Sequence, residues 1–127
     1  MSLADGTVAT RLPTQDLERA RRFYADKLGL EPVEERPGGL LYRCGGKEFA
    51  LYASTGASSG TFTQMGWSVD DLDATMAELE ARGLEFADEF GTVVVEGNYP
   101  SKGGRGEHAA WFRDSEGNLL GIGQALH

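Results

Sequence analysis

The stretch LPTQDLERARRFYADKLGLEPV (residues 12–33) contains the signals that start and end a helix. Asp16 precedes apolar residues at helical spacing, and its side chain can accept hydrogen bonds from the first free N–H groups of a helix. Gly29 is typical of the left-handed residue that ends one. Short β-type segments at 7–13, 31–36, 39–45 and 47–54 surround this helix, separated by Pro-Gly and Gly-Gly turns. Residues 5–54 are therefore predicted to form a βαβββ unit.

The same pattern returns in GWSVDDLDATMAELEARGLEF (residues 66–86). Asp16-Leu17 aligns with Asp71-Leu72 at a spacing of 55 residues. A strand at 61–69, a helix ending at Arg82, a strand at 92–95 and a C-terminal hairpin complete a second unit over residues 61–125. We therefore expect a single domain of 127 residues with an α+β fold, built by internal duplication, in which each helix covers one face of a sheet.

Composition excludes several classes of function. The chain has 12 Lys and Arg against 20 Asp and Glu, a net charge of −8. This charge does not suit nucleic acid binding, and it favours a neutral or cationic ligand. One cysteine excludes an intrachain disulfide and a thiolate metal cluster. No apolar run reaches the roughly 18 residues of a membrane span and none is typical of a signal peptide, so we expect a cytoplasmic protein without membrane contact.

The last hairpin, FRDSEGNLLGIGQ (residues 112–124), carries glycine at alternate strand positions, Gly121 and Gly123. Glycine weakens a strand, so two on one face need a reason. Either another backbone approaches closely, or a ligand is bound there, or an expected side chain is missing.

Residues 12–33, 66–86 and 110–124 resemble the vicinal oxygen chelate superfamily, which includes glyoxalase I, extradiol dioxygenases, and fosfomycin and bleomycin resistance proteins. The resemblance implies two βαβββ modules that form a U-shaped mixed sheet around a ligand cleft, in a homodimer. It also implies that metal-dependent members take one metal ligand from the first strand and one from the last strand of each module. The matching positions here are Ala9, Leu51, Gln64 and Gly121.

Of these four positions, only Gln64 offers an oxygen, so no metal and no cofactor is expected. Gly121 stands where metal-dependent relatives have a glutamate. The chain thus looks most like the metal-independent members of the bleomycin-resistance type.

Strand alternation extends these positions to a set of candidate ligand-binding residues. The set is Arg11, Phe49, Leu51, Phe62, Gln64, Ser68, His108, Phe112 and Gly121. His108 and Phe112 join it if residues 114–117 form a four-residue loop. Tyr52, Trp67 and Trp111 are then expected to point towards the helices.

The candidates also have structural interpretations. Arg11 is either a solvated or salt-bridged surface residue or the anchor for a carboxylate or carbonyl of a ligand. Gln64 either binds the ligand or is a satisfied buried amide. His108 is either a general base or an edge-strand residue. The phenylalanines are either core residues or the apolar wall of the cleft.

Other conspicuous residues have simpler explanations. Cys44 is expected to be a buried apolar filler. The acidic residues at 70–73 are explained by helix capping, and Asp114 and Glu116 by the turn that contains them. The Gly-rich segment 97–106 is expected to be a lid over the cleft.

The sequence thus predicts a metal-independent protein that binds a small, antibiotic-like molecule and has no catalytic residue. Two alternatives stay open. One is a glyoxalase-like lyase or dioxygenase-type enzyme that uses a divalent metal, and the other is a non-catalytic binding module for a partner protein.

Overall fold

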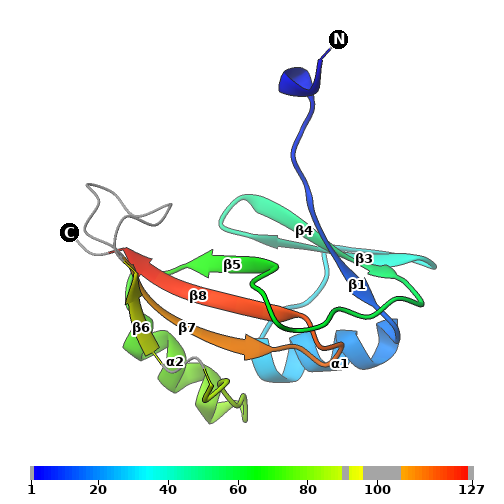
Figure 1. Ribbon diagram of the computed structural model, residues 1–127. Helices are drawn as coiled ribbons and strands as arrows, with labels where there is room; N and C mark the ends of the chain where they lie inside the picture. Colours follow the sequence, from blue (N-terminus) through cyan, green and yellow to red (C-terminus); the bar gives the residue numbers. More distant parts are fainter. Residues whose placement is uncertain (1, 90–91, 96–106, 126–127) are drawn as a thin grey trace.

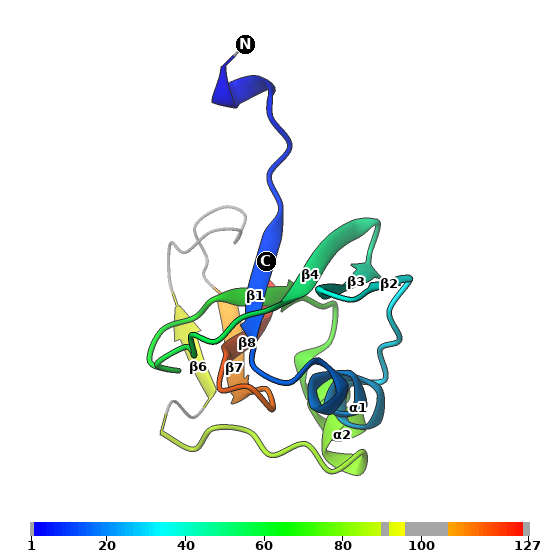
Figure 2. The ribbon, with the colours of Figure 1, turned by 90° about the vertical axis from the view of Figure 1, so that its right-hand side faces the viewer.

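The computed structural model describes residues 2–89, 92–95 and 107–125, and its elements follow in the order of a duplicated unit (Figure 1). The first module consists of β1 (Thr10–Thr14), α1 (Leu17–Leu28), β2 (Glu34–Arg36), β3 (Gly39–Cys44) and β4 (Lys47–Ala53). The second consists of β5 (Met65–Ser68), α2 (Leu72–Ala81), β6 (Thr92–Val95), β7 (Glu107–Arg113) and β8 (Leu119–Ala125). A short 3-10 helix, η1 (Leu3–Asp5), lies on an N-terminal segment that extends away from the body (Figures 1 and 2). The expected α+β class is confirmed.

Each module forms its own four-stranded mixed sheet, in the order β1-β4-β3-β2 and β5-β8-β7-β6. In both sheets the first strand of the module runs parallel to the last, and the other pairs are antiparallel. The two sheets therefore share one topology, as the duplication predicts.

The two helices begin and end where the local signals predict. The side chain of Asp16 accepts from the backbone N–H of Arg19, and that of Asp71 from Ala74, both at 3.0 Å. Gly29 ends α1 with a φ of 71°, and Gly83 follows α2 with a φ of 94°. Neither helix is long and apolar enough to cross a membrane, within the part of the chain that the structure describes.

The helix-facing sides of both sheets share one hydrophobic core. Leu51 and Phe112 are fully buried in it, one from each module. The ring of Trp67 joins them across the seam between the modules, since its centroid lies 5.9 Å from Phe49 and 6.1 Å from Phe112.

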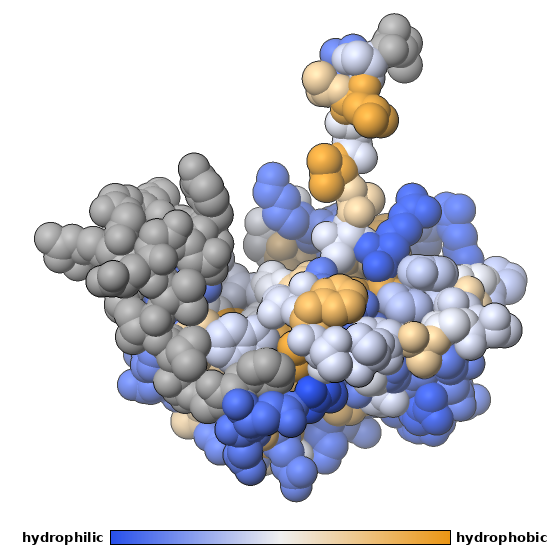
Figure 3. Space-filling model, in the orientation of Figure 1, coloured by the Kyte–Doolittle hydropathy of each residue, from blue (hydrophilic) through white to orange (hydrophobic). Residues whose placement is uncertain are grey.

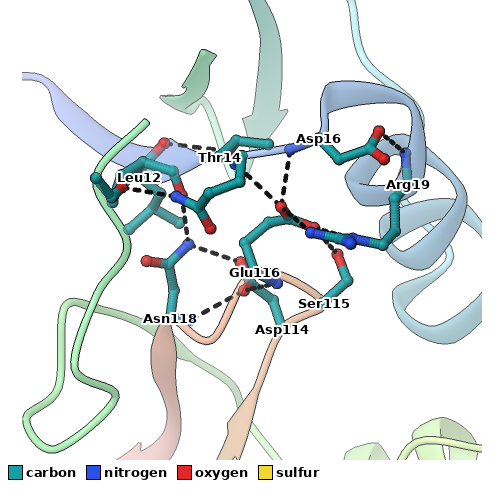
Figure 4. A network of polar contacts seen from close by, with 11 residues as sticks. Leu12, Thr14, Asp16, Arg19, Asp114, Ser115, Glu116 and Asn118 are labelled. Carbon is teal, nitrogen blue, oxygen red and sulfur yellow. Dashed lines mark hydrogen bonds and ion pairs between the residues drawn. The ribbon is translucent and has the colours of Figure 1, made fainter. Parts of the chain in front are cut away.

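A polar connection also joins the modules, at the turn between β7 and β8 (Figure 4). Glu116 of this turn reaches the start of α1, where its Oε1 accepts from the backbone N–H groups of Gln15 and Asp16, each at 3.0 Å. Arg19 donates to both carboxylate oxygens. The carboxylate therefore satisfies N–H groups at a helix start that belongs to the other module.

Asp114 makes a second, buried connection between the modules. Its Oδ2 accepts from the hydroxyl of Tyr24 on α1 at 2.7 Å. Asn118 donates to the same oxygen and to the carbonyl of Pro13. The acidic residues of this turn thus hold the modules together, which goes beyond the turn formation expected from the sequence.

Candidate functional site

The side of each sheet that faces away from its helix is its open face. On the first sheet, the strand register aligns Arg11, Ala50, Leu41 and Glu34 in one row across this face. The face borders a hollow of about 540 Å³. Its floor is largely apolar, and Tyr52, a residue that is 41% exposed, contributes to its lining.

Arg11 is the distinctive charge of this hollow. The other cations and anions around it are paired, Arg36 with Glu34 at 2.9 Å and Arg43 with Glu48 at 2.6 Å. Within the described residues, the exposed guanidinium of Arg11 has no hydrogen bond or ion pair. A cation without a counter-charge is therefore presented beside an apolar floor.

The open face of the second sheet borders a separate hollow of about 480 Å³. The register places Gly66, Gly121 and Trp111 side by side across it. The indole N–H of Trp111 donates to Thr63 Oγ1 at 2.9 Å. The ring thus lies as a fixed aromatic surface on a floor rich in glycine.

This arrangement explains Gly121. A Cβ atom at this position would lie 3.1 Å from Nε1 and 3.3 Å from Cδ1 of Trp111, closer than carbon atoms normally pack. A Cβ atom at Gly123 would overlap the carboxylate of Glu107, but this is the end of a flexible side chain, which can move aside. Of the three reasons considered above, close approach therefore applies to Gly121, with the Trp111 ring of the neighbouring strand in place of a backbone.

The expected orientation of β4 is wrong by one residue. Arg11 pairs with Ala50 in the first sheet, and Gly66 pairs with Gly121 in the second. The 55-residue spacing of the repeat relates Arg11 to Gly66, so Ala50, and not Leu51, is equivalent to Gly121. Leu51 and its neighbour Phe49 on β4 have their side chains in the core, with exposed fractions of 0% and 6%.

The expected orientation of β7 is wrong for a related reason. Arg113 pairs directly with Leu119, so the turn between them has five residues, 114–118. Within this turn the N–H of Asn118 donates to Asp114 Oδ1. The extra residue reverses the faces of β7, so Phe112 and His108 lie on the helix-facing side. Trp111, like Tyr52 on β4, lies on the open face. Trp67 points into the core as expected.

The remaining candidates lie apart from Arg11. Gln64 Oε1 accepts from Ser58 Oγ and from the backbone N–H of Leu119, which favours its interpretation as a satisfied amide. Phe62 is 61% exposed and precedes β5, which begins only at Met65. Ser68 lines the hollow of the second sheet. The expected lid at 97–106 lies outside the described residues.

The donor atoms present do not fit a divalent metal. The corrected set of positions is Ala9, Ala50, Gln64 and Gly121, in which the amide oxygen of Gln64 is the single side-chain donor. Across residues 2–89, 92–95 and 107–125, no group of three or more His, Cys, Asp and Glu side chains could hold an ion. Protein sites for divalent ions need several oxygens, imidazoles or thiolates.

The family model described as "Glyoxalase/Bleomycin resistance protein/Dioxygenase superfamily" matches residues 6–122. Among solved structures, a glyoxalase/bleomycin resistance protein/dioxygenase from Alicyclobacillus acidocaldarius is similar, with 18% identity over 100% of this chain and 96% of that one and a TM-score of 0.72. A lactoylglutathione lyase from Agrobacterium tumefaciens has 22% identity over 94% and 93% of the two chains and a TM-score of 0.62. The fosfomycin resistance protein FosX from Listeria monocytogenes has 12% identity over 96% and 94%, with a TM-score of 0.67. No curated protein matches the sequence.

Proposed function

Because this chain belongs to the glyoxalase/bleomycin resistance protein/dioxygenase superfamily, we propose that it binds a small organic molecule on the open faces of its sheets without a divalent metal. The composition of these faces carries the proposal. They combine apolar floors, the cation of Arg11 and the fixed ring of Trp111, and the residues described by the structure provide neither a counter-charge for Arg11 nor a set of metal donors. These groups suit recognition of a ligand, and none of them is a general base.

The same groups indicate the chemistry of the ligand. A guanidinium donates two parallel hydrogen bonds to a carboxylate and single ones to a carbonyl. The rings of Trp111 and Tyr52 favour a flat apolar body. The net charge of −8 would also attract a ligand that carries a positive charge elsewhere in the molecule, because this attraction acts over a longer range than the contact with Arg11.

We further propose that the protein is a homodimer. In a single chain each open face borders a hollow of its own, and among the described residues no strand pairs with the outer edge of β1 or of β5. Leu3 and Val8 are 98% and 96% exposed, and Figure 3 shows apolar side chains on the N-terminal segment standing clear of the body. A second copy would cover these surfaces. Light scattering that finds a monomer at micromolar concentration would contradict this.

Binding can be tested with a thermal-shift panel of aromatic carboxylates and the cationic antibiotic bleomycin, followed by calorimetry on any ligand found. Arg11→Ala should weaken binding about tenfold or more, because a charge-assisted contact is lost. Arg22→Ala is the matched control, because Arg22 lies on the exposed side of α1 beside Glu18.

The affinity should be the same after treatment with EDTA and after addition of Zn²⁺, Ni²⁺ or Mn²⁺. A ligand that binds only with metal, or is turned over, would contradict the proposal and favour the lyase or dioxygenase alternative. Capture of a partner protein with no small-molecule binding would favour the binding-module alternative.

A further inference from the structure

A third hollow lies on the opposite side of the sheets from Arg11 and Trp111, at the seam between the two modules. We call it the seam pocket; its volume is about 170 Å³. It is lined by Leu28, Leu30 and Cys44 from the first module and by Trp67, Leu79 and Phe112 from the second, among others. Both modules therefore contribute to its walls.

The walls of the seam pocket offer a ligand no charge. All residues that line it are uncharged. Its one hydroxyl, that of Thr75, already donates to the carbonyl of Asp71 at 2.8 Å. The thiol of Cys44 is a weak donor that behaves as a small apolar group. A charged molecule would lose its hydration here without gaining a partner.

The size of the pocket and its apolar lining suit a single aromatic ring. An engineered protein cavity of about 150 Å³ with similar apolar walls binds benzene. One wall is itself aromatic, because Trp67 stacks on Phe112 with an angle of 17° between the rings. Aromatic rings favour offset or edge contacts with such a surface.

The pocket can be reached from solvent. Leu28, Leu30, Cys44 and Val69 are only half-buried at its border, so entry of a small molecule requires no unfolding. A ligand in the pocket would remove its apolar walls from water and gain dispersion contacts with residues of both modules. Its binding would therefore stabilise the packing of the two modules.

We propose that the seam pocket binds a compact, uncharged aromatic molecule. The proposal does not rest on the function proposed for the open faces, because the two sites lie on opposite sides of the sheets.

Fluorobenzene is a direct probe, followed by its ¹⁹F NMR signal as the protein is titrated. We expect saturable binding of fluorobenzene but not of benzoate or benzylammonium, which have similar rings and a charge. Val69→Leu and Cys44→Leu each fill part of the pocket and should weaken binding about tenfold or more. Val33→Leu is the matched control, because Val33 is 52% exposed and lies outside the pocket, and it should leave binding unchanged.

Alkylation of Cys44 by iodoacetamide gives a second measurement that needs no variant. Saturating fluorobenzene should slow the reaction several-fold, and benzoate should not change it. Unchanged alkylation together with unchanged fluorobenzene binding in the filled variants would overturn the proposal. Absence of any fluorobenzene binding would also overturn it, and is the result expected if a side chain of a second copy fills the pocket.

Discussion

Arg19 on the first helix and Glu116 in the last turn, 97 residues apart, form an ion pair with two hydrogen bonds of 2.9 and 2.8 Å. The side chain of Glu116 is fully buried, whereas that of Arg19 is 49% exposed. The hydrogen bond from Arg19 lowers the pKa of Glu116 from 4.5 to about 2, against the opposing effect of burial.

This pKa predicts a pH-dependent contribution to stability. A carboxyl with a lowered pKa stabilises the fold above its unfolded pKa and loses that effect as the pH falls through its folded pKa. Glu116→Gln should therefore lower the free energy of unfolding by about 2 kcal/mol at pH 7, reduced from the full linkage value because Arg19 is half exposed.

Urea denaturation of both proteins at a series of pH values measures this effect. The difference between them should shrink as the pH falls from about 5 to about 2. Glu18→Gln is the control, because its ion pair with Arg22 is exposed and should contribute little. A difference that stays constant with pH would contradict the assignment.

Two buried tyrosines form a matched pair. The hydroxyl of Tyr24 donates to Asp114, whereas that of Tyr42 is buried without a partner among the described residues. Tyr24→Phe should cost about 1–2 kcal/mol, because it removes a donor to a buried carboxylate. Tyr42→Phe should be neutral or stabilising, because it removes an unsatisfied group. Equal losses in chemical denaturation would contradict this difference.

The contact of Gly121 with Trp111 predicts the effect of placing a carboxylate at position 121. Gly121 has no positive φ, so space and not backbone conformation limits substitution. Gly121→Glu should destabilise by about 1–3 kcal/mol through overpacking. Combination with Trp111→Ala should relieve part of this loss, with a coupling of about 1 kcal/mol.

Thermal melts of the two single variants and the double variant measure this coupling. Gly38→Glu is the control, since a Cβ atom there would meet nothing within 4 Å and Gly38 has no positive φ. Strictly additive losses at positions 111 and 121 would contradict the contact.

The helix caps give a fourth prediction. Asp16→Ala and Asp71→Ala should each lower the free energy of unfolding by about 1 kcal/mol, because each removes the acceptor for a free N–H group. Asp73→Ala should cost less, about 0.3–0.5 kcal/mol, because Asp73 contributes only its charge near the helix start. Urea denaturation that ranks Asp73 equal to the caps would contradict this.

The helices and their limits could be predicted from the sequence because Asp16, Gly29 and Asp71 act on residues within one turn of themselves. The sequence did not allow a correct prediction of which side chains of β4 and β7 point towards the helices. Side chains alternate along a strand, so a single residue that joins the turn reverses every later orientation. Nothing local shows whether Asn118 belongs to the turn or to the strand.

The residues of the candidate site could likewise be predicted where local signals determine their orientation, but not where strand pairing does. Arg11 lies on β1, directly before the helix start at Asp16, which fixes the orientation of that strand. The repeat relates Arg11 to Gly66, the neighbour of Gly121, and both Arg11 and Gly121 lie on open faces as expected. Tyr52 and Trp111 were missed because their faces depend on strand pairing. The length of the hairpin turn is the signal that could have identified Trp111.

The packing of Trp111 on Gly121 also restricts how this sequence can change. A glutamate at position 121 should cost less stability once position 111 has become smaller, so the two substitutions are accepted more easily when the change at position 111 comes first. We expect homologous sequences to vary these two positions together, with a large aromatic at 111 inherited alongside glycine at 121. Recovery of a glutamate at this position by descent would therefore be favoured along a path in which position 111 changes first.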